Sequence, residues 1–245
     1  MKKPTPEERL IVALDVPTAK DAQKWIKKLS PVVKRFKVGM ELFTAEGPQT
    51  VTAINTAGAR VFLDLKFFDI PNTMAGALRS AATLKPFLVN VHALAGPAAL
   101  ARCAQEMKKL KTPPKLLAVT VLTSFSEQEL KRIGLGGVDA TVTKLCGMAL
   151  KAGLDGVVAS PREAALLRKK FGNDFLIVTP GVRPAWADAN DQKRITTPYD
   201  AIRNGADYIV VGRPVLDAPD PRETARRIID EIKEACAWKK KAGRI

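Results

Sequence analysis

Residues 60–73, RVFLDLKFFDIPNT, join a strand pattern directly to a helix start. The first eight residues are rich in apolar and aromatic side chains, which predicts a strand over 60–67. Pro71 suits the first turn of a helix, where its missing N–H has no partner to lose, so a helix is expected to begin near Pro71 and to continue through MAGALRSAATL. The chain therefore passes from a strand to a helix within a few residues.

The same strand pattern recurs along the whole chain. Segments with helical spacing separate the strands, for example the segment after Ser160 and Pro161, where Ser160 is expected to be the N-cap. Parallel strands need such crossovers and are usually buried on both faces, in agreement with the short apolar runs. The other predicted strands are residues 9–15, 35–39, 87–92, 115–123, 155–160, 175–179 and 207–212.

Eight strand–helix repeats in 245 residues predict an α/β protein, a single-domain (β/α)8 TIM barrel over residues 1–245. An open, doubly wound sheet fits this number of repeats less well. No linker marks a second domain. The basic segment from about residue 237 is expected to be a short, frayed or solvated tail.

The composition indicates a folded protein with excess positive charge on its surface. Lys and Arg number 40 and Asp and Glu number 25, which gives a net charge of +15, but 46% of the residues are hydrophobic. No apolar run is long enough for a membrane-spanning helix, and the N-terminus lacks the apolar region of a signal peptide, so a cytoplasmic protein is expected. Three distant cysteines and one histidine argue against a disulfide framework and a zinc site.

In a TIM barrel, functional side chains gather where the strands end. Asp64 and Lys66 are two residues apart near the end of one strand, so their side chains are expected to share the inner face of the barrel mouth. Lys37, near the end of the preceding strand, can approach this pair, whereas Asp69 lies beyond the strand. A structural ion pair is the alternative interpretation. The cost of desolvating several converging charges favours a functional site.

A second group of residues follows the last two predicted strands. Residues 179–184, TPGVRP, open a polar loop, and the final strand ends in Gly212 and Arg213. Loops at these positions form the usual phosphate site of a TIM barrel. Gly212 allows close approach of the backbone, and Arg213 supplies a guanidinium for a phosphate dianion.

Taken together, seven motifs resemble the orotidine 5′-phosphate decarboxylase family. They occur in the family's order and span about residues 10 to 216. Asp64-x-Lys66-x-x-Asp69 alone is shared by a wider superfamily, so the whole set gives the resemblance its specificity. The motifs are Leu14-Asp15-Val16, Phe36-Lys37-Val38-Gly39, residues 64–73, Val121-Leu122-Thr123-Ser124, residues 179–184, Gln192 with Arg194, and Val211-Gly212-Arg213.

The resemblance implies a role for each matching residue. Lys37, Asp64, Lys66 and Asp69 match the family's alternating charged array, in which Lys66 is the proton donor to C6 of the pyrimidine. It also implies a homodimer, in which Asp69 and Thr73 complete the site of the partner subunit. The remaining substrate positions are Asp15 and Lys37 at the ribose, Thr123 at the pyrimidine, and Arg183, Gln192, Gly212 and Arg213 at the phosphate.

The implied reaction converts orotidine 5′-monophosphate to uridine 5′-monophosphate and CO2, a step of de novo pyrimidine biosynthesis, with no cofactor and no metal. Loss of CO2 leaves an electron pair on C6 that the ring delocalises poorly. Because no cofactor accepts these electrons, fixed charges must stabilise the carbanion. Lys66 would stabilise and then protonate it, and Asp64 would lie near the departing carboxylate.

Two other functions stay open at this point. A metal-dependent phosphosugar decarboxylase or aldolase of the same superfamily would share the Asp64 motif, but those enzymes have a carboxylate where Lys37 stands, and a lysine repels Mg²⁺. Nucleic-acid binding is suggested by the charge of +15. However, only 6% of the residues are aromatic and no nucleic-acid motif is present, so no nucleic-acid partner is expected.

Overall fold

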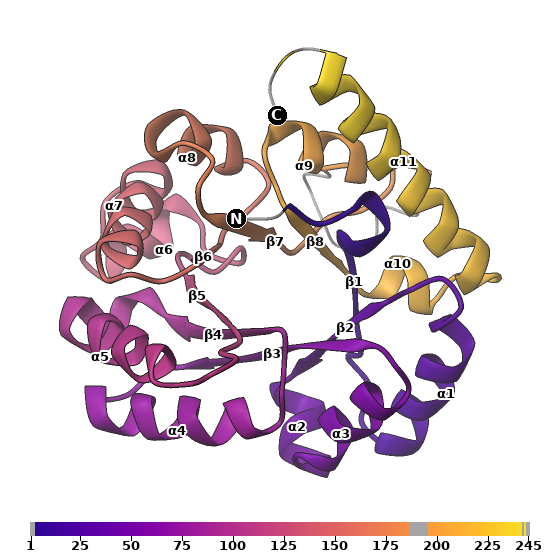
Figure 1. The fold of residues 1–245 in the computed structure, drawn as a ribbon. Coiled ribbons are helices and arrows are strands. Elements are labelled where there is room, and N and C mark those ends of the chain that lie inside the picture. The colour runs from indigo at the N-terminus through magenta and orange to yellow at the C-terminus, as the bar shows by residue number, and fades with distance from the viewer. Residues whose placement is uncertain (1–2, 187–195, 242, 244–245) are drawn as a thin grey trace.

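The chain alternates strands and helices and closes into a parallel barrel, as the sequence predicts. The computed structural model describes residues 3–186, 196–241 and 243. Each strand pairs with its neighbour in the sequence, and β8 pairs with β1 to complete the ring (Figure 1). The strands are β1 (Leu10–Ala13), β2 (Arg35–Gly39), β3 (Arg60–Phe67), β4 (Leu88–His92), β5 (Lys115–Val119), β6 (Gly156–Val158), β7 (Leu176–Thr179) and β8 (Tyr208–Val211).

Helices surround the barrel on the outside (Figure 1). They bury their apolar faces against the outer faces of the strands, which explains why the strands are apolar on both sides. They are α1 (Ala19–Leu29), α2 (Met40–Glu46), α3 (Gln49–Thr56), α4 (Pro71–Thr83), α5 (Gly96–Lys108), α6 (Glu127–Arg132), α7 (Val138–Lys151), α8 (Ala164–Phe171), α9 (Pro198–Asn204), α10 (Arg213–Leu216) and α11 (Pro221–Lys241), with short 3₁₀ turns η1 (Pro6–Glu8) and η2 (Ala93–Ala95).

Two local predictions are wrong. Ser160 is not the N-cap of α8, because residues 161–163 form a turn and the helix begins at Ala164. The Ser160 hydroxyl instead accepts a hydrogen bond from the N–H of Arg162. The basic segment from about residue 237 is not a frayed tail as far as Lys241, since α11 includes it and the guanidinium of Arg203 lies 5.0 Å from the Trp238 ring centroid.

The barrel interior is divided into layers along its axis. Apolar side chains fill the middle, including Phe62, Leu117 and Val178. Because strand residues alternate between faces, the side chains two positions from Phe62 also point inward, namely Arg60 at the N-terminal end of β3 and Asp64 toward its C-terminal end. The two charged ends of the barrel are therefore separated by an apolar core.

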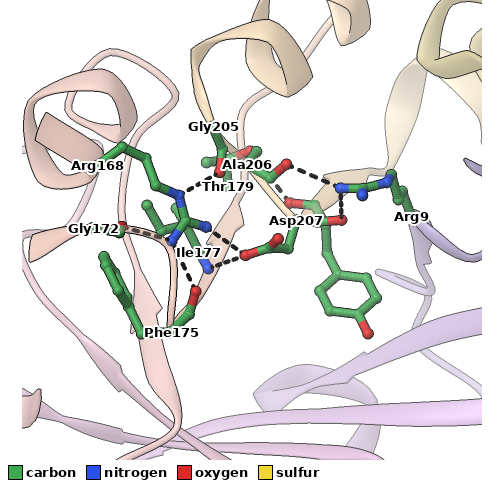
Figure 2. A network of polar contacts seen from close by, with 10 residues as sticks. Arg9, Arg168, Gly172, Phe175, Ile177, Thr179, Gly205, Ala206 and Asp207 are labelled. Carbon is green, nitrogen blue, oxygen red and sulfur yellow. Dashed lines mark hydrogen bonds and ion pairs between the residues drawn. The ribbon is translucent and has the colours of Figure 1, made fainter. Parts of the chain in front are cut away.

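An ion-pair network ties β7 and β8 to the helices at the N-terminal end of the barrel (Figure 2). Asp207 accepts a 2.6 Å contact from Arg168 of α8 and a 2.9 Å hydrogen bond from the N–H of Ile177. Arg9, just before β1, donates to the carbonyls of Ala206 and Asp207. The network thus joins β1, β7 and β8 where the barrel closes.

No helix among the described residues is long and apolar enough to span a membrane.

Candidate active site

Asp64 is the centre of a charged cluster at the C-terminal end of the barrel. Its carboxylate is nearly buried, and its Oδ1 accepts a hydrogen bond from Nζ of Lys66 at 2.8 Å. Nζ of Lys37 lies 3.7 Å from Oδ2 of Asp64 and 2.8 Å from Oδ1 of Asp15. Lysines and carboxylates therefore alternate in space in the order Asp15, Lys37, Asp64 and Lys66.

Asn90 of β4 fixes this cluster to the barrel wall. Its amide nitrogen donates to Oδ1 of Asp64 at 2.7 Å, and its Oδ1 accepts the backbone N–H of Lys66 at 2.8 Å. The register between β3 and β4 shifts between Leu63 and Phe67, and Lys66 has a φ of 50°, which is uncommon for a residue with a side chain. Asn90 holds both the carboxylate and the strained backbone in place.

Two glycines lie beside the charged residues, and the close contact at Gly39 leaves no room for a side chain. A Cβ atom at Gly39 would lie 2.9 Å from Nζ of Lys37, so any side chain there would displace the lysine. A Cβ atom at Gly212 would lie 3.6 Å from Oδ2 of Asp15. Gly212 therefore packs beside the Asp15–Lys37 pair, although it belongs to the opposite end of the sequence.

The charges of the cluster support one another. Burial alone would raise the pKa of Asp64, but the positive charges of Lys37 and Lys66 and the hydrogen bonds from Lys66 and Asn90 outweigh it, and the pKa is lowered. Asp64 is therefore an anion at neutral pH despite its burial. The cluster carries two negative and two positive charges, so each ammonium group is oriented by a carboxylate before a ligand binds.

A cavity of about 240 Å³ opens directly onto these residues. Lys37, Asp64 and Lys66 form its charged side, and the other side is mostly apolar, with Phe62 of β3, residues of β5, β6 and β8, and residues that follow β5, β6 and β7. Thr123 and Ser124 lie on its rim and also line an adjoining, wider cavity of about 950 Å³. A small planar ring with one charged edge matches this division into a polar and an apolar side.

The expected phosphate residues lie in a neighbouring hollow. Arg183 and Arg213 line a separate cavity of about 390 Å³. It lies beside the part of the loop after β7 that the structure describes, which ends at Trp186. Arg213 begins α10 directly after Gly212, which connects this hollow to the Asp15 side of the cluster. Gln192 lies outside the described residues.

Asp69 and Thr73 do not join the cluster within one chain. Oδ1 of Asp69 accepts the N–H of Ile70, and Thr73 is exposed on the first turn of α4. Their side chains lie on the outer surface of the C-terminal end of the barrel rather than in the cavity with Asp64.

Two polar residues at strand ends have local structural contacts. Nδ1 of His92 accepts the N–H of Leu94, and its ring lies 5.6 Å from that of Phe68. Burial, and then the charge of Lys66, lowers the pKa of His92, so this histidine is neutral near pH 7. Thr179 is fully buried and donates to the carbonyl of Tyr208.

Sequence reasoning missed Asn90 and the contact made by Gly39. A single amide in an otherwise apolar strand, FLVNVH, was an available signal, because a buried polar group needs a partner. The partner itself depends on the register between β3 and β4, which the sequence does not display.

Comparison with known proteins indicates the family of this chain. Residues 8–228 match the model of the family described as "Orotidine 5'-phosphate decarboxylase / HUMPS family". Proteins named orotidine 5′-phosphate decarboxylase from Geotalea daltonii and Geobacter sulfurreducens are each 51% identical to this chain. The first match covers 91% of this chain and 95% of the Geotalea protein. The second covers 95% of this chain and 99% of the Geobacter protein.

A solved structure shares the same fold. The crystal structure of orotidine 5′-phosphate decarboxylase from Lactobacillus acidophilus superposes with a TM-score of 0.82 at 36% identity, over 92% of this chain and 99% of the other. The matched region includes every strand of the barrel and the whole charged cluster. The chain belongs to the orotidine 5′-phosphate decarboxylase / HUMPS family.

Proposed function

We propose that this protein is a carboxy-lyase that converts orotidine 5′-monophosphate to uridine 5′-monophosphate and CO2 in pyrimidine biosynthesis. The observation that supports it most directly is the buried Asp64 carboxylate held between Lys37 and Lys66 at the mouth of a cavity. Membership of the family and the names of the close relatives support the same reaction.

In the proposed mechanism, the pyrimidine lies in the cavity with its C6 carboxylate toward Asp64 and Lys66. The bond from C6 to the carboxylate breaks, CO2 leaves, and the electron pair stays on C6. The ammonium of Lys66 stabilises that pair and then transfers a proton to it. Because Lys66 is already oriented by Asp64 and by the backbone contact with Asn90, little reorganisation accompanies the reaction.

The phosphate would supply binding energy away from the reacting carbon. Arg183 and Arg213 are arranged around one hollow beside Gly212, and we assign the phosphate to them, together with Gln192. Binding at this distance assists decarboxylation only if it positions the ring against Lys66. Asp15 and Lys37 lie between the two regions and would hold the ribose, and Thr123 on the cavity rim would contact the pyrimidine.

The donor set favours this reaction over a metal-dependent one. Lys37 lies 3.7 Å from Asp64, so a divalent cation on that carboxylate would meet an ammonium group beside it. We therefore propose that decarboxylation proceeds without a metal. A cytoplasmic location is likewise proposed from the sequence.

We also propose a homodimer that buries the C-terminal face of the barrel. Apolar side chains are exposed there, on the segment between β3 and α4 that carries Asp69 and at the starts of α2 and η2, and large exposed apolar patches mark interfaces. Asp69 and Thr73, which lie away from their own cavity, would then complete that of the partner subunit. The exposed apolar residues are Met40, Phe68, Ile70 and Leu94.

Loss of orotidine 5′-monophosphate absorbance, followed with and without EDTA, tests the reaction. We expect rapid turnover that EDTA does not change. Turnover abolished by EDTA and restored by Mg²⁺ would assign the site to the metal-dependent enzymes instead. Absence of turnover in a folded sample would contradict the proposal altogether.

Mixing two inactive variants tests the dimer. Lys66→Ala removes a residue of a chain's own site, and Asp69→Ala removes one given to the partner. In a mixed dimer one of the two sites is intact, so random mixing should restore up to about a quarter of wild-type activity. No recovery from two variants that both form dimers would contradict the assignment of Asp69.

A further inference from the structure

The N-terminal end of the barrel contains a second large cavity, unrelated to the Asp64 cluster. Its volume is about 960 Å³, and it lies between the starts of β2 to β5 and the loops that precede β3, β4 and β5. Arg60, on its wall, and Asp64 are four positions apart on the extended strand β3, which corresponds to about 13 Å between their Cα atoms. The apolar layer around Phe62 lies between the two cavities.

The lining of this cavity is strongly basic, and none of the described residues that line it is acidic. Three of its cations form ion pairs with carboxylates outside the lining: Arg35 with Glu8 at 3.0 Å, Arg79 with Glu106 at 2.8 Å, and Lys115 with Asp155 at 2.7 Å. Among the described residues, no ion pair is present for the other three, Arg60, Lys85 and Lys111.

Two of these arginines lie side by side. Arg35 and Arg60 are register partners on β2 and β3, so their side chains leave the sheet on the same face, from strands about 4.8 Å apart. Like charges at neighbouring strand positions are unfavourable unless a counter-charge lies between them. Glu8 contacts Arg35, which leaves Arg60 facing the cavity without a carboxylate of its own among the described residues.

Lys85 lies at the rim of the cavity, directly after the C-cap residue of α4. Its φ is 55°, in the left-handed region where glycine or asparagine is the usual residue, and it stands in the tight turn between α4 and β4. This conformation is common directly after a helix C-cap, and a lysine there costs somewhat more stability than a glycine would. This turn contributes a positive charge to the same cavity wall as Arg60 and Lys111.

The rest of the wall is rigid and partly apolar. Pro86, Pro113 and Pro114 restrict the loops, and the Phe87 ring is held by the Arg35 guanidinium, 4.9 Å from its centroid, and by the edge of Tyr208. A cavity with cations on one side and an apolar, aromatic wall on the other suits a phosphate chain attached to a ring.

We propose that this cavity binds the triphosphate group of a small molecule, either inorganic triphosphate or a nucleoside triphosphate. The phosphate oxygens would contact Arg60, Lys85 and Lys111, and a base or ribose, where present, would lie against Phe87 and the prolines. A single-stranded nucleic acid fits less well, because Phe87 is the only aromatic residue among the described lining residues, and such ligands stack on several rings.

Isothermal titration of the purified full-length protein with sodium triphosphate and with ATP, at about 0.15 M salt, tests the proposal. The double variant Lys85→Gln/Lys111→Gln should weaken triphosphate binding about tenfold or more and leave decarboxylation unchanged. The matched control, Lys20→Gln/Lys27→Gln on α1, removes the same charge from an exposed helix and should change the affinity less than about twofold. ATP binding more tightly than triphosphate would assign the ring to the Phe87 wall, and equal affinity would assign recognition to the phosphates alone.

Four results would overturn the proposal. Equal weakening by both double variants would indicate a general effect of net charge. Binding lost in Arg213→Ala but retained in Lys85→Gln/Lys111→Gln would place the anion in the hollow beside the catalytic cavity. A dissociation constant above about 1 mM for both ligands, or an oligonucleotide that binds more tightly than either and displaces them, would also exclude a triphosphate site.

Discussion

Asp64 and Lys66 form a 2.8 Å ion pair at the point where β3 departs from regular strand geometry. Lys66 adopts a φ of 50°, and its backbone N–H is held by Asn90, which also donates to Asp64. Strain of this kind costs about 1–3 kcal/mol and persists where the surroundings fix it. The barrel thus sacrifices some stability to hold an ammonium group against a buried carboxylate.

The Lys66→Ala variant should lose decarboxylation by about 10⁴-fold or more, because it removes both the positive charge beside C6 and the proton donor. Far-UV circular dichroism should show a folded protein, because the substitution removes no side chain from the packed apolar core. Turnover is measured by loss of substrate absorbance. Lys27→Ala, on the exposed face of α1, is the control and should keep wild-type turnover. A rate within about tenfold of wild type for Lys66→Ala would remove this lysine from the mechanism.

Asn90→Ala should lower both stability and turnover. The variant leaves the backbone N–H of Lys66 without its acceptor and removes one of the two hydrogen bonds to Oδ1 of Asp64, which costs about 1–3 kcal/mol of unfolding free energy. Displacement of the lysine should lower kcat about tenfold to a hundredfold. Urea unfolding and steady-state kinetics measure the two effects.

Asn55→Ala is the matched control for Asn90. Asn55 donates to the carbonyl of Leu84 at the other end of the barrel, so its loss should lower stability and leave kcat unchanged. If both variants change kcat equally, the effect belongs to general loosening of the barrel and not to the Asp64–Lys66 pair.

Arg213→Ala should mainly raise KM. Loss of a guanidinium that contacts a phosphate dianion costs about 1.5–3 kcal/mol, which corresponds to a rise of roughly tenfold to a hundredfold. Steady-state kinetics over a wide range of substrate concentration separate KM from kcat. An unchanged KM would contradict the assignment of the hollow lined by Arg183 and Arg213 to the phosphate.

The sequence allowed the barrel to be predicted because all eight strands combine apolar periodicity with abrupt polar ends. The errors are local. At Ser160 the hydroxyl bonds within a turn, and side chains of this type compete with helix starts in that way. At the C-terminus, Trp238 contacts Arg203 of α9, a residue distant in sequence, so a local pattern contained no sign that α11 continues.

For the site, alternation along one strand was sufficient to bring Asp64 and Lys66 together, and the order of strands added Lys37. Asn90 escaped because its contacts depend on the register between β3 and β4 and on a bulge in β3, and Gly39 escaped because its close contact depends on the path of the Lys37 side chain. The roles of Asp69 and Thr73 depend on a second subunit, which the sequence implies only through family resemblance.

Arg168→Met should destabilise the barrel without affecting catalysis. The substitution leaves the Asp207 carboxylate, which is almost buried, without its 2.6 Å partner (Figure 2), and uncompensated buried charges cost about 3–5 kcal/mol. Urea unfolding measures the loss, and kcat per folded molecule should stay at the wild-type value. The double variant Arg168→Met/Asp207→Asn should recover part of the stability. No loss in the single variant would show that solvent reaches Asp207 freely.

The last prediction concerns the response of stability to acid at Glu106 of α5. Hydrogen bonds from Arg79, Lys109 and Arg102 lower the pKa of Glu106 to about 2. The folded-state pKa lies below the unfolded value, about 4.3, so the contribution of this carboxylate is complete above pH 4.3 and is lost as the pH falls toward 2. Glu106→Gln cannot ionise and lacks this contribution at every pH.

The difference in unfolding free energy between wild type and Glu106→Gln should therefore be constant from about pH 7 to 5 and shrink steadily from about pH 4 to 2. Urea unfolding at each pH measures it. Glu127→Gln, an exposed carboxylate on α6, is the control, and its difference from wild type should show no comparable fall in that range. A difference for Glu106→Gln that stays constant down to pH 2 would mean that the three cations do not act on this carboxylate.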